Sequence, residues 1–132
     1  MADLIFKDEA FKVVGICMNI HKTLGMGLKE INYKDAMEIE FIDDSIYYER
    51  EKKFAVEYKG KILRNPYIAD YVVFNSIILE IKSTSAIIEQ HITQALSYLS
   101  VSKLKLALVI NFGERSFNVE TNCFIINVIS KN

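Results

Sequence analysis

The stretch from Asp70 to Lys82 constrains the fold of this chain more than any other part of its sequence. Two runs of β-branched and aromatic residues flank the polar pair Asn75-Ser76, a pattern that predicts a β-hairpin. The runs also contain three charged residues, which are Asp70, Glu80 and Lys82. Charged side chains are seldom buried unless they are paired or bind a metal ion. Three charges near the centre of a predicted sheet therefore require a physical explanation.

Two registers of this hairpin are open from the sequence. Alternate residues of a strand share a face, so Glu80 and Lys82 point the same way. A two-residue loop would pair Tyr71 with Glu80 and turn Asp70 to the other face. A three-residue loop formed by residues 74–76, or a bulge, would place Asp70 directly opposite Glu80. A site that uses both carboxylates needs the second register.

The composition is that of an ordinary globular domain, with 51% hydrophobic and 25% charged residues. A chain of 132 residues can bury one core, so we expect a single domain over residues 1–132. The net charge of -1 provides no general attraction to nucleic acid. Several basic residues gather locally, and they form either a basic strip or solvated strand and turn positions: Lys52, Lys53, Lys59, Lys61, Arg64, Lys103 and Lys105.

The sequence predicts a soluble, cytoplasmic protein. Cys17 and Cys123 lie in apolar contexts without C-x-x-C spacing, which indicates small core residues in a reducing compartment. Acidic residues at Asp3, Asp8 and Glu9 break the apolar start of the chain, so it does not resemble a secretory signal. No apolar run approaches the roughly 20 residues that a membrane-spanning helix needs.

Apolar periodicity predicts the order of helices and strands. Helical patterns cover residues 7–21, 28–41 and 86–100, and the third helix has three N-cap candidates before it, Ser83, Thr84 and Ser85. Extended patterns cover residues 46–58, 61–63, 106–112 and 117–129 in addition to the central hairpin. This order predicts an α/β (α+β) fold, with a central mixed β-sheet flanked by helices.

The hairpin charges favour a particular chemistry. Two converging carboxylates suit Mg²⁺, which prefers hard oxygen ligands and keeps several of its waters. Such an ion can polarise a phosphodiester and activate water for in-line attack. Beside two carboxylates and a phosphate, Lys82 is expected to remain a cation that orients the water and stabilises the developing charge. The alternative is that the three hairpin charges simply pair with one another.

Two pairs of helical residues could extend this site. Glu30 and Tyr33 are three residues apart and share a helix face, although Glu30 could instead stabilise the helix N-terminus while Tyr33 packs in the core. Gln94 and Tyr98 are four residues apart on the third helix, and the alternative there is a solvent-facing glutamine above a packed tyrosine. The two histidines are too few and too scattered to predict a zinc site.

Taken in order, these motifs resemble the small bacterial and archaeal proteins that are named for a Gly-x-x-Glu-x-x-Tyr motif, within the PD-(D/E)XK nuclease superfamily. The resemblance covers residues 9–113, and Ala69 stands where the superfamily name has proline. Three motifs carry it: Gly27, Glu30 and Tyr33 for the family name, Asp70 with Glu80-Ile81-Lys82 for the metal-site signature, and Gln94 with Tyr98 for the Gln-x-x-x-Tyr motif of RecB-like nucleases.

The resemblance implies a restriction-endonuclease-like core that hydrolyses DNA phosphodiesters with Mg²⁺ or Mn²⁺. The implied roles are metal binding by Asp70, Glu80, the carbonyl of Ile81 and Glu30, catalysis by Lys82, and support of the site by Gln94 and Tyr98. A different expectation is a non-catalytic nucleic-acid-binding or protein-interaction module that retains the same fold. A homodimer would help such a small and nearly neutral domain to hold a duplex.

Overall fold

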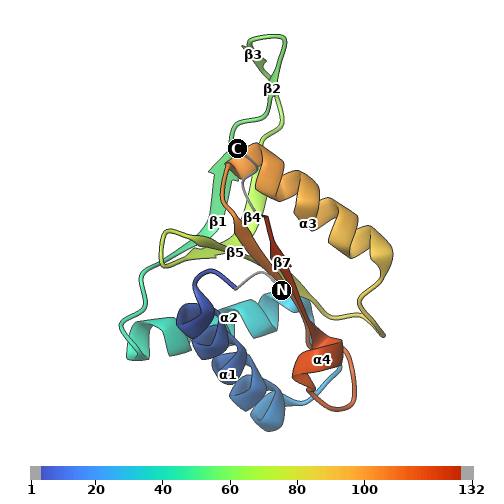
Figure 1. Cartoon of the computed structure of the whole chain (residues 1–132). Helices are drawn as coiled ribbons and strands as arrows, with labels where there is room; N and C mark the ends of the chain where they lie inside the picture. Colours follow the sequence, from blue (N-terminus) through green and yellow to red (C-terminus); the bar gives the residue numbers. More distant parts are fainter. Residues whose placement is uncertain (1–3, 129–132) are drawn as a thin grey trace.

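Five β-strands form the central sheet of the computed structural model, which describes residues 4–128, and helices pack on both faces of this sheet (Figure 1). The strand order is β1-β4-β5-β6-β7, with β5 and β6 parallel and the other neighbours antiparallel. The predicted mixed sheet flanked by helices is therefore confirmed. The elements are α1 (Lys7–Leu24), α2 (Glu30–Asp43), β1 (Tyr48–Phe54), β2 (Glu57–Tyr58), β3 (Lys61–Ile62), β4 (Tyr67–Val73), β5 (Ile77–Lys82), α3 (Glu89–Ser102), β6 (Leu106–Asn111), α4 (Val119–Asn122) and β7 (Cys123–Asn127).

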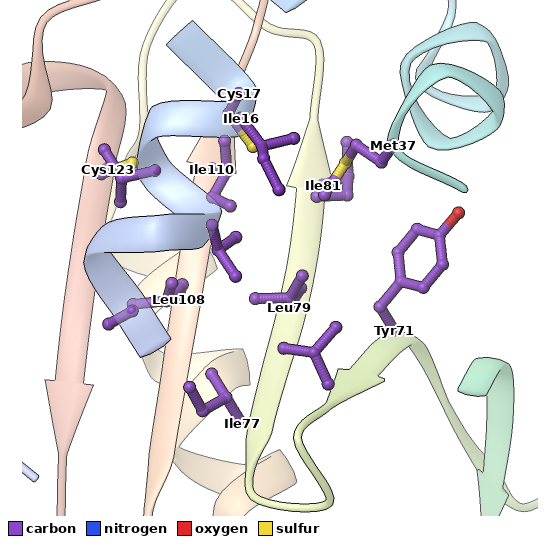
Figure 2. Close-up of a cluster of buried hydrophobic side chains, with 14 of the residues drawn as sticks. Ile16, Cys17, Met37, Tyr71, Ile77, Leu79, Ile81, Leu108, Ile110 and Cys123 are labelled. Atoms are coloured by element: carbon purple, nitrogen blue, oxygen red, sulfur yellow. The ribbon is translucent and has the colours of Figure 1, made fainter. Parts of the chain in front are cut away.

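Two hydrophobic cores lie on opposite faces of the sheet. One packs α1 and α2 onto the sheet, and Figure 2 shows Ile16, Met37 and Leu79 among its residues. The other packs α3 onto the opposite face through residues such as Leu99 and Val109. Every residue of β6 is buried, as expected of a strand that is covered on both sides. Among residues 4–128, no helix combines the length and the apolar character that crossing a membrane requires.

The hairpin of β4 and β5 adopts the three-residue loop. Val73 pairs with Ile77, so residues 74–76 form the connection, and its first two residues have positive φ values of 55° and 56°. Two consecutive positive φ values are typical of the tight turns that match the twist of a hairpin. Continued along the strands, this register places Asp70 opposite Glu80. The second of the two registers considered from the sequence is thus confirmed.

The start of α3 differs from the prediction. None of the three predicted N-cap residues caps it: Ser83, Thr84 and Ser85. Instead, the N-cap is Ile88, whose N–H donates to Nδ1 of His91 at 3.1 Å. The cause lies in β6, because the Asn111 side chain accepts from the N–H of Thr84 and donates to its carbonyl oxygen, both at 2.9 Å. These bonds hold the chain against the sheet and delay the helix.

The predicted extended segment 117–129 contains a short helix before its strand. The side chain of Asn118 accepts from the N–H of Glu120 at 2.8 Å, as an N-cap residue does, and α4 follows. β7 then completes the sheet, and Ile129, the predicted end of the strand, lies outside the described residues. At the other end of the chain, α1 extends three residues beyond its predicted boundary to Leu24, and Gly25 ends it with a φ of 70°.

A second, two-stranded sheet is formed by β2 and β3. Figure 1 shows this hairpin projecting beyond the end of the main sheet, near the C-terminal end of α3. The predicted turn at Lys59-Gly60 connects its strands, with φ values of 51° and 75°.

Candidate metal centre

The alternation of side chains in β4 shifts by one residue at Asp70. Tyr67 and Ala69 pack in the core beneath α3, whereas Tyr71 packs in the core beneath α1 and α2. In a regular strand these three residues would share one face. The neighbouring strand is irregular at the same level, because Glu51 of β1 has a φ of 53°. Local irregularities of this kind redirect side chains, and here the redirected side chain is that of Asp70.

The carboxylate of Asp70 is held between β5 and α2. Its Oδ2 accepts a hydrogen bond of 2.7 Å from the N–H of Ile81, which ties it to the strand that carries Glu80. Its Oδ1 accepts from the ammonium group of Lys34 at 3.1 Å. The Lys34 side chain is almost fully buried, and its Nζ also lies 3.6 Å from Oε1 of Glu51. Asp70 is therefore oriented on both of its oxygens.

Glu80 is buried beside Asp70, with only 6% of the residue exposed. Its Oε1 accepts a hydrogen bond of 2.6 Å from the hydroxyl of Tyr67. Burial, followed by the charge of Asp70, raises the pKa of Glu80 to about 8, and the bond from Tyr67 and the charge of Lys82 act against this rise. Without a metal ion, the two neighbouring carboxyl groups therefore resist carrying full negative charge together.

Lys82 lies at the end of β5, two residues after Glu80 and on the same face of the strand. Its charge acts on Glu80 and also on His91. The pKa of His91 is lowered first by burial and then by the charge of Lys82, while the charge of Glu30 raises it. Lys82 and Glu30 thus both lie within electrostatic range of His91.

The remaining predicted residues lie around this centre in different ways. Glu30 is the exposed first residue of α2. Among residues 4–128, no group of three or more His, Cys, Asp or Glu side chains is placed to hold a metal ion. Gln94 is half-buried on α3, and its side chain makes no hydrogen bond to residues 4–128.

Tyr98 stacks on Tyr67, with ring centroids 3.8 Å apart and an interplanar angle of 10°. Its pKa is raised by burial and then by the charges of Glu80 and Asp70, which places Tyr98 within electrostatic range of both carboxylates. The stacked rings of Tyr67 and Tyr98 therefore lie on the α3 side of the sheet, where the hydroxyl of Tyr67 bonds to Glu80.

The donor set at this site fits Mg²⁺. It consists of two carboxylates, with the backbone carbonyl of Ile81 next to Glu80, and all of these are hard oxygen ligands. Mg²⁺ typically uses one or two carboxylates and keeps several waters, whereas a structural zinc ion needs four nitrogen or sulfur ligands. After burial, the charge of Asp70 is the second cause that raises the pKa of Glu80, and a divalent cation relieves repulsion of this kind.

Two residues that contact the carboxylates did not emerge from the sequence. Lys34 comes directly after Tyr33 and four residues after Glu30, so i,i+4 spacing was the one signal for placing it on the helix face that meets the site. Tyr67 lies three residues before Asp70, where regular alternation would have put it on the opposite face. The shift in alternation at Asp70 brings Tyr67 under Glu80, and the sequence carries no sign of that shift.

Comparisons with known proteins bear on this arrangement. The sequence profile described as PD-(D/E)XK nuclease superfamily matches residues 7–123, which include four strands of the main sheet and reach the first residue of β7. No curated protein matches the sequence. The crystal structure of SSO0001 is similar in fold, with a TM-score of 0.53 and 17% sequence identity, over 74% of this chain. The match spans about half of that protein, 49% of its chain.

Proposed function

This chain belongs to the PD-(D/E)XK nuclease superfamily, with its restriction-endonuclease-like fold, and on that basis we propose that it is a Mg²⁺-dependent nuclease that hydrolyses DNA phosphodiester bonds. The observation that carries the proposal is the register of the central hairpin. It brings Asp70 opposite Glu80, with Lys82 two residues further along the same strand face. Two carboxylates and a cation in this order suit phosphodiester hydrolysis.

Each residue of the centre has a distinct part in the proposed reaction. Asp70, Glu80 and the carbonyl of Ile81 would hold the ion, and bound Mg²⁺ supplies Lewis-acid activation of the phosphodiester and of the attacking water. Lys82 would contact the phosphate and stabilise its developing negative charge. Tyr67 keeps the carboxylate of Glu80 in place through its 2.6 Å hydrogen bond.

Glu30, Gln94 and Tyr98 would act at the edge of the centre. Glu30 is exposed and lies within electrostatic range of His91, and from there it would reach the ion through a water or contact the substrate. Gln94 is half-buried with an amide free to hydrogen-bond to a nucleotide. Tyr98 supports the ring of Tyr67 by stacking, and in this way it supports Glu80.

A cleavage assay on end-labelled single-stranded and double-stranded DNA tests this function. We expect cleavage with Mg²⁺ or Mn²⁺, none with EDTA, and a loss of about 100-fold or more in Glu80→Gln and in Lys82→Met. Lys12→Met, on the exposed surface of α1, is the matched control for the loss of a lysine and should cleave at the wild-type rate. Cleavage that persists unchanged in Glu80→Gln would contradict the proposal.

A specific observation supports a second candidate function, a nucleic-acid-binding module without catalysis. The buried ammonium group of Lys34 already gives Asp70 a positive partner at 3.1 Å. A resident lysine can balance part of the charge that a metal ion would otherwise balance. If this second function holds, the wild-type protein should retain DNA in a salt-dependent manner while Mg²⁺ has no effect on binding and no cleavage occurs.

A further inference from the structure

Residues 57–64 comprise the β2–β3 hairpin and the two residues after it, and we call this segment the arm. The arm contributes no side chain to either hydrophobic core. All of these residues are exposed, and the hairpin projects beyond the sheet (Figure 1). Beyond the β2–β3 pairs, the two sides of the hairpin form one further hydrogen bond, in which the N–H of Leu63 donates to the carbonyl oxygen of Val56 at 2.8 Å. Two-stranded hairpins are at best marginally stable alone, so a projecting hairpin with exposed apolar residues indicates a surface that binds something.

The charge of the arm indicates what it binds. The arm contains three cationic side chains and one carboxylate, that of Glu57. The cations are those of Lys59, Lys61 and Arg64. None of the three cations forms an ion pair with a residue in the part of the chain that the structure describes. Tyr58 is 62% exposed, and the Nζ of Lys59 lies 5.5 Å from the centre of its ring. Unpaired cations next to an exposed aromatic ring are suited to a nucleic-acid strand.

The surface between the base of the arm and α3 is hollowed. One hollow of about 460 Å³ is lined by Val56 and Pro66 at the base of the arm, by Tyr98 and Val101 of α3, and by Tyr67. A second hollow of about 360 Å³ lies next to it and shares Val56 and Val101. The first hollow is largely apolar and aromatic, which suits the flat face of a base. It also adjoins the candidate centre, because the hydroxyl of Tyr67 donates to Glu80.

We propose that the arm and the 460 Å³ hollow together bind single-stranded nucleic acid. The cations of the arm hold the backbone phosphates, and an unpaired base enters the hollow against Tyr98. An apolar hollow can accept a base only where that base has left the stack of a duplex, so single strands are favoured over duplexes. This inference rests on the proposed nuclease function and names its substrate class.

Binding is measured by fluorescence anisotropy in EDTA, with one labelled oligonucleotide as a single strand and as its duplex. We expect the wild type to bind the single strand more tightly. The triple variant Lys59→Glu, Lys61→Glu, Arg64→Glu should bind the single strand about tenfold or more weakly. The salt dependence of its binding should also be shallower, by about two in the log–log slope, because three phosphate contacts are lost.

A charge-matched control separates the arm from net charge. Lys7→Glu, Lys12→Glu, Lys22→Glu changes the total charge equally on exposed positions of α1, which Figure 1 shows at the opposite end of the molecule from the arm. This variant should bind nearly as well as the wild type, and circular dichroism spectra should show that both triple variants are folded. Equal losses in the two variants, or no loss in the arm variant, would overturn the proposal.

The aromatic part of the proposal has its own test. Tyr58→Ala should weaken single-strand binding about fivefold or more, whereas Tyr47→Ala, also at an exposed tyrosine, should not. Photo-cross-linking of an oligonucleotide that contains 5-bromouracil should label Tyr58 or Tyr98. Cross-links confined to residues outside the arm and the hollow, or equal affinity for the duplex, would contradict the single-strand assignment.

Failure of this inference and failure of the proposed function give different results. Single-strand binding in EDTA that depends on the arm, without cleavage in Mg²⁺, would support the inference and refute the nuclease. Cleavage that depends on Glu80 but prefers a duplex and ignores the arm variants would overturn the inference and support the nuclease.

Discussion

Glu80 lowers the stability of the metal-free fold and is also a proposed metal ligand. The carboxyl group is buried opposite Asp70, and this position raises its pKa to about 8. A protein without a function for that carboxylate would gain stability from an apolar side chain there. The hydrogen bond from Tyr67 relieves only part of the cost.

The stability of the metal-free protein should therefore depend on pH through Glu80. In the unfolded chain its carboxyl group has a pKa near 4.5, and below that pH it is protonated in both states. Between about 4.5 and 8 the folded state retains a proton that the unfolded state has lost, so the free energy of unfolding should fall as pH rises, on the order of a few kcal/mol.

Urea denaturation in EDTA across this pH range measures the effect. Glu80→Gln keeps an oxygen that can accept from Tyr67 but has no proton to lose, so its curve should be flatter than that of the wild type. Parallel curves for the two proteins would show that Glu80 does not titrate in this range.

Lys34 should behave as the internal counter-ion of Asp70. Its side chain is almost fully buried and its Nζ lies 3.1 Å from the carboxylate, so Lys34→Met removes a buried partner and should destabilise the metal-free protein by roughly 3 kcal/mol. Mg²⁺ should recover part of this loss, because a divalent cation can replace the missing charge at Asp70.

Thermal melting with and without Mg²⁺ provides the measurement. The increase in Tm on adding Mg²⁺ should be larger in Lys34→Met than in the wild type. An equally large destabilisation that Mg²⁺ leaves untouched would favour the non-catalytic alternative, in which Lys34 takes the place of the ion.

At the scale of elements, the ends of β5 and β6 are clasped together beside the centre. Asn111 is fully buried at the end of β6 and bonds to both backbone groups of Thr84, and to the N–H of Gly113 at 3.0 Å. A Cβ atom on Gly113 would lie 2.2 Å from the carbonyl oxygen of Thr84 and 2.6 Å from the carbonyl carbon of Ser83. The segment that follows Lys82 is therefore fixed by close backbone contact.

Gly113→Ala tests this clasp. The added methyl group must displace backbone atoms, so we expect a loss of roughly 1–3 kcal/mol in the free energy of unfolding, together with weaker metal binding. Gly15→Ala is the matched control, since nothing lies within 4 Å of its Cβ position inside α1, and it should stabilise the protein by about 0.5–1 kcal/mol. Equal effects of the two substitutions, measured by urea denaturation, would argue against the clasp.

The sequence predicted elements better than it predicted the contacts between them. Apolar periodicity found α1, α2 and β6, because these elements bury a regular face or are buried throughout. It misplaced the start of α3, because Thr84 is a good N-cap residue whose backbone is held against the sheet by Asn111, from a distant part of the chain. Long-range hydrogen bonds of this kind leave no local pattern.

At the scale of the whole molecule, the sheet places the carboxylate pair where three layers meet. Lys34 reaches it from α2, Tyr67 and Tyr98 cover it on the α3 side, and the arm ends a few residues before β4. The sequence indicated Asp70 and Glu80 because charges stand out in apolar strands. It did not indicate Tyr67, and for Lys34 it offered only the i,i+4 spacing from Glu30, since a buried lysine and a shift in alternation depend on how α2 and β1 pack against β4.

The central claim is that Asp70 and Glu80 form a metal site, and calorimetric titration of the protein with Mn²⁺ tests it most directly. The wild type should show saturable binding, and the Asp70→Ala, Glu80→Ala double variant, shown to be folded by circular dichroism, should show none. The titration is repeated with a short DNA strand present, because nucleic acid can complete the coordination of the ion. Binding of equal strength in both proteins, or no binding by the wild type even with DNA, would contradict the claim.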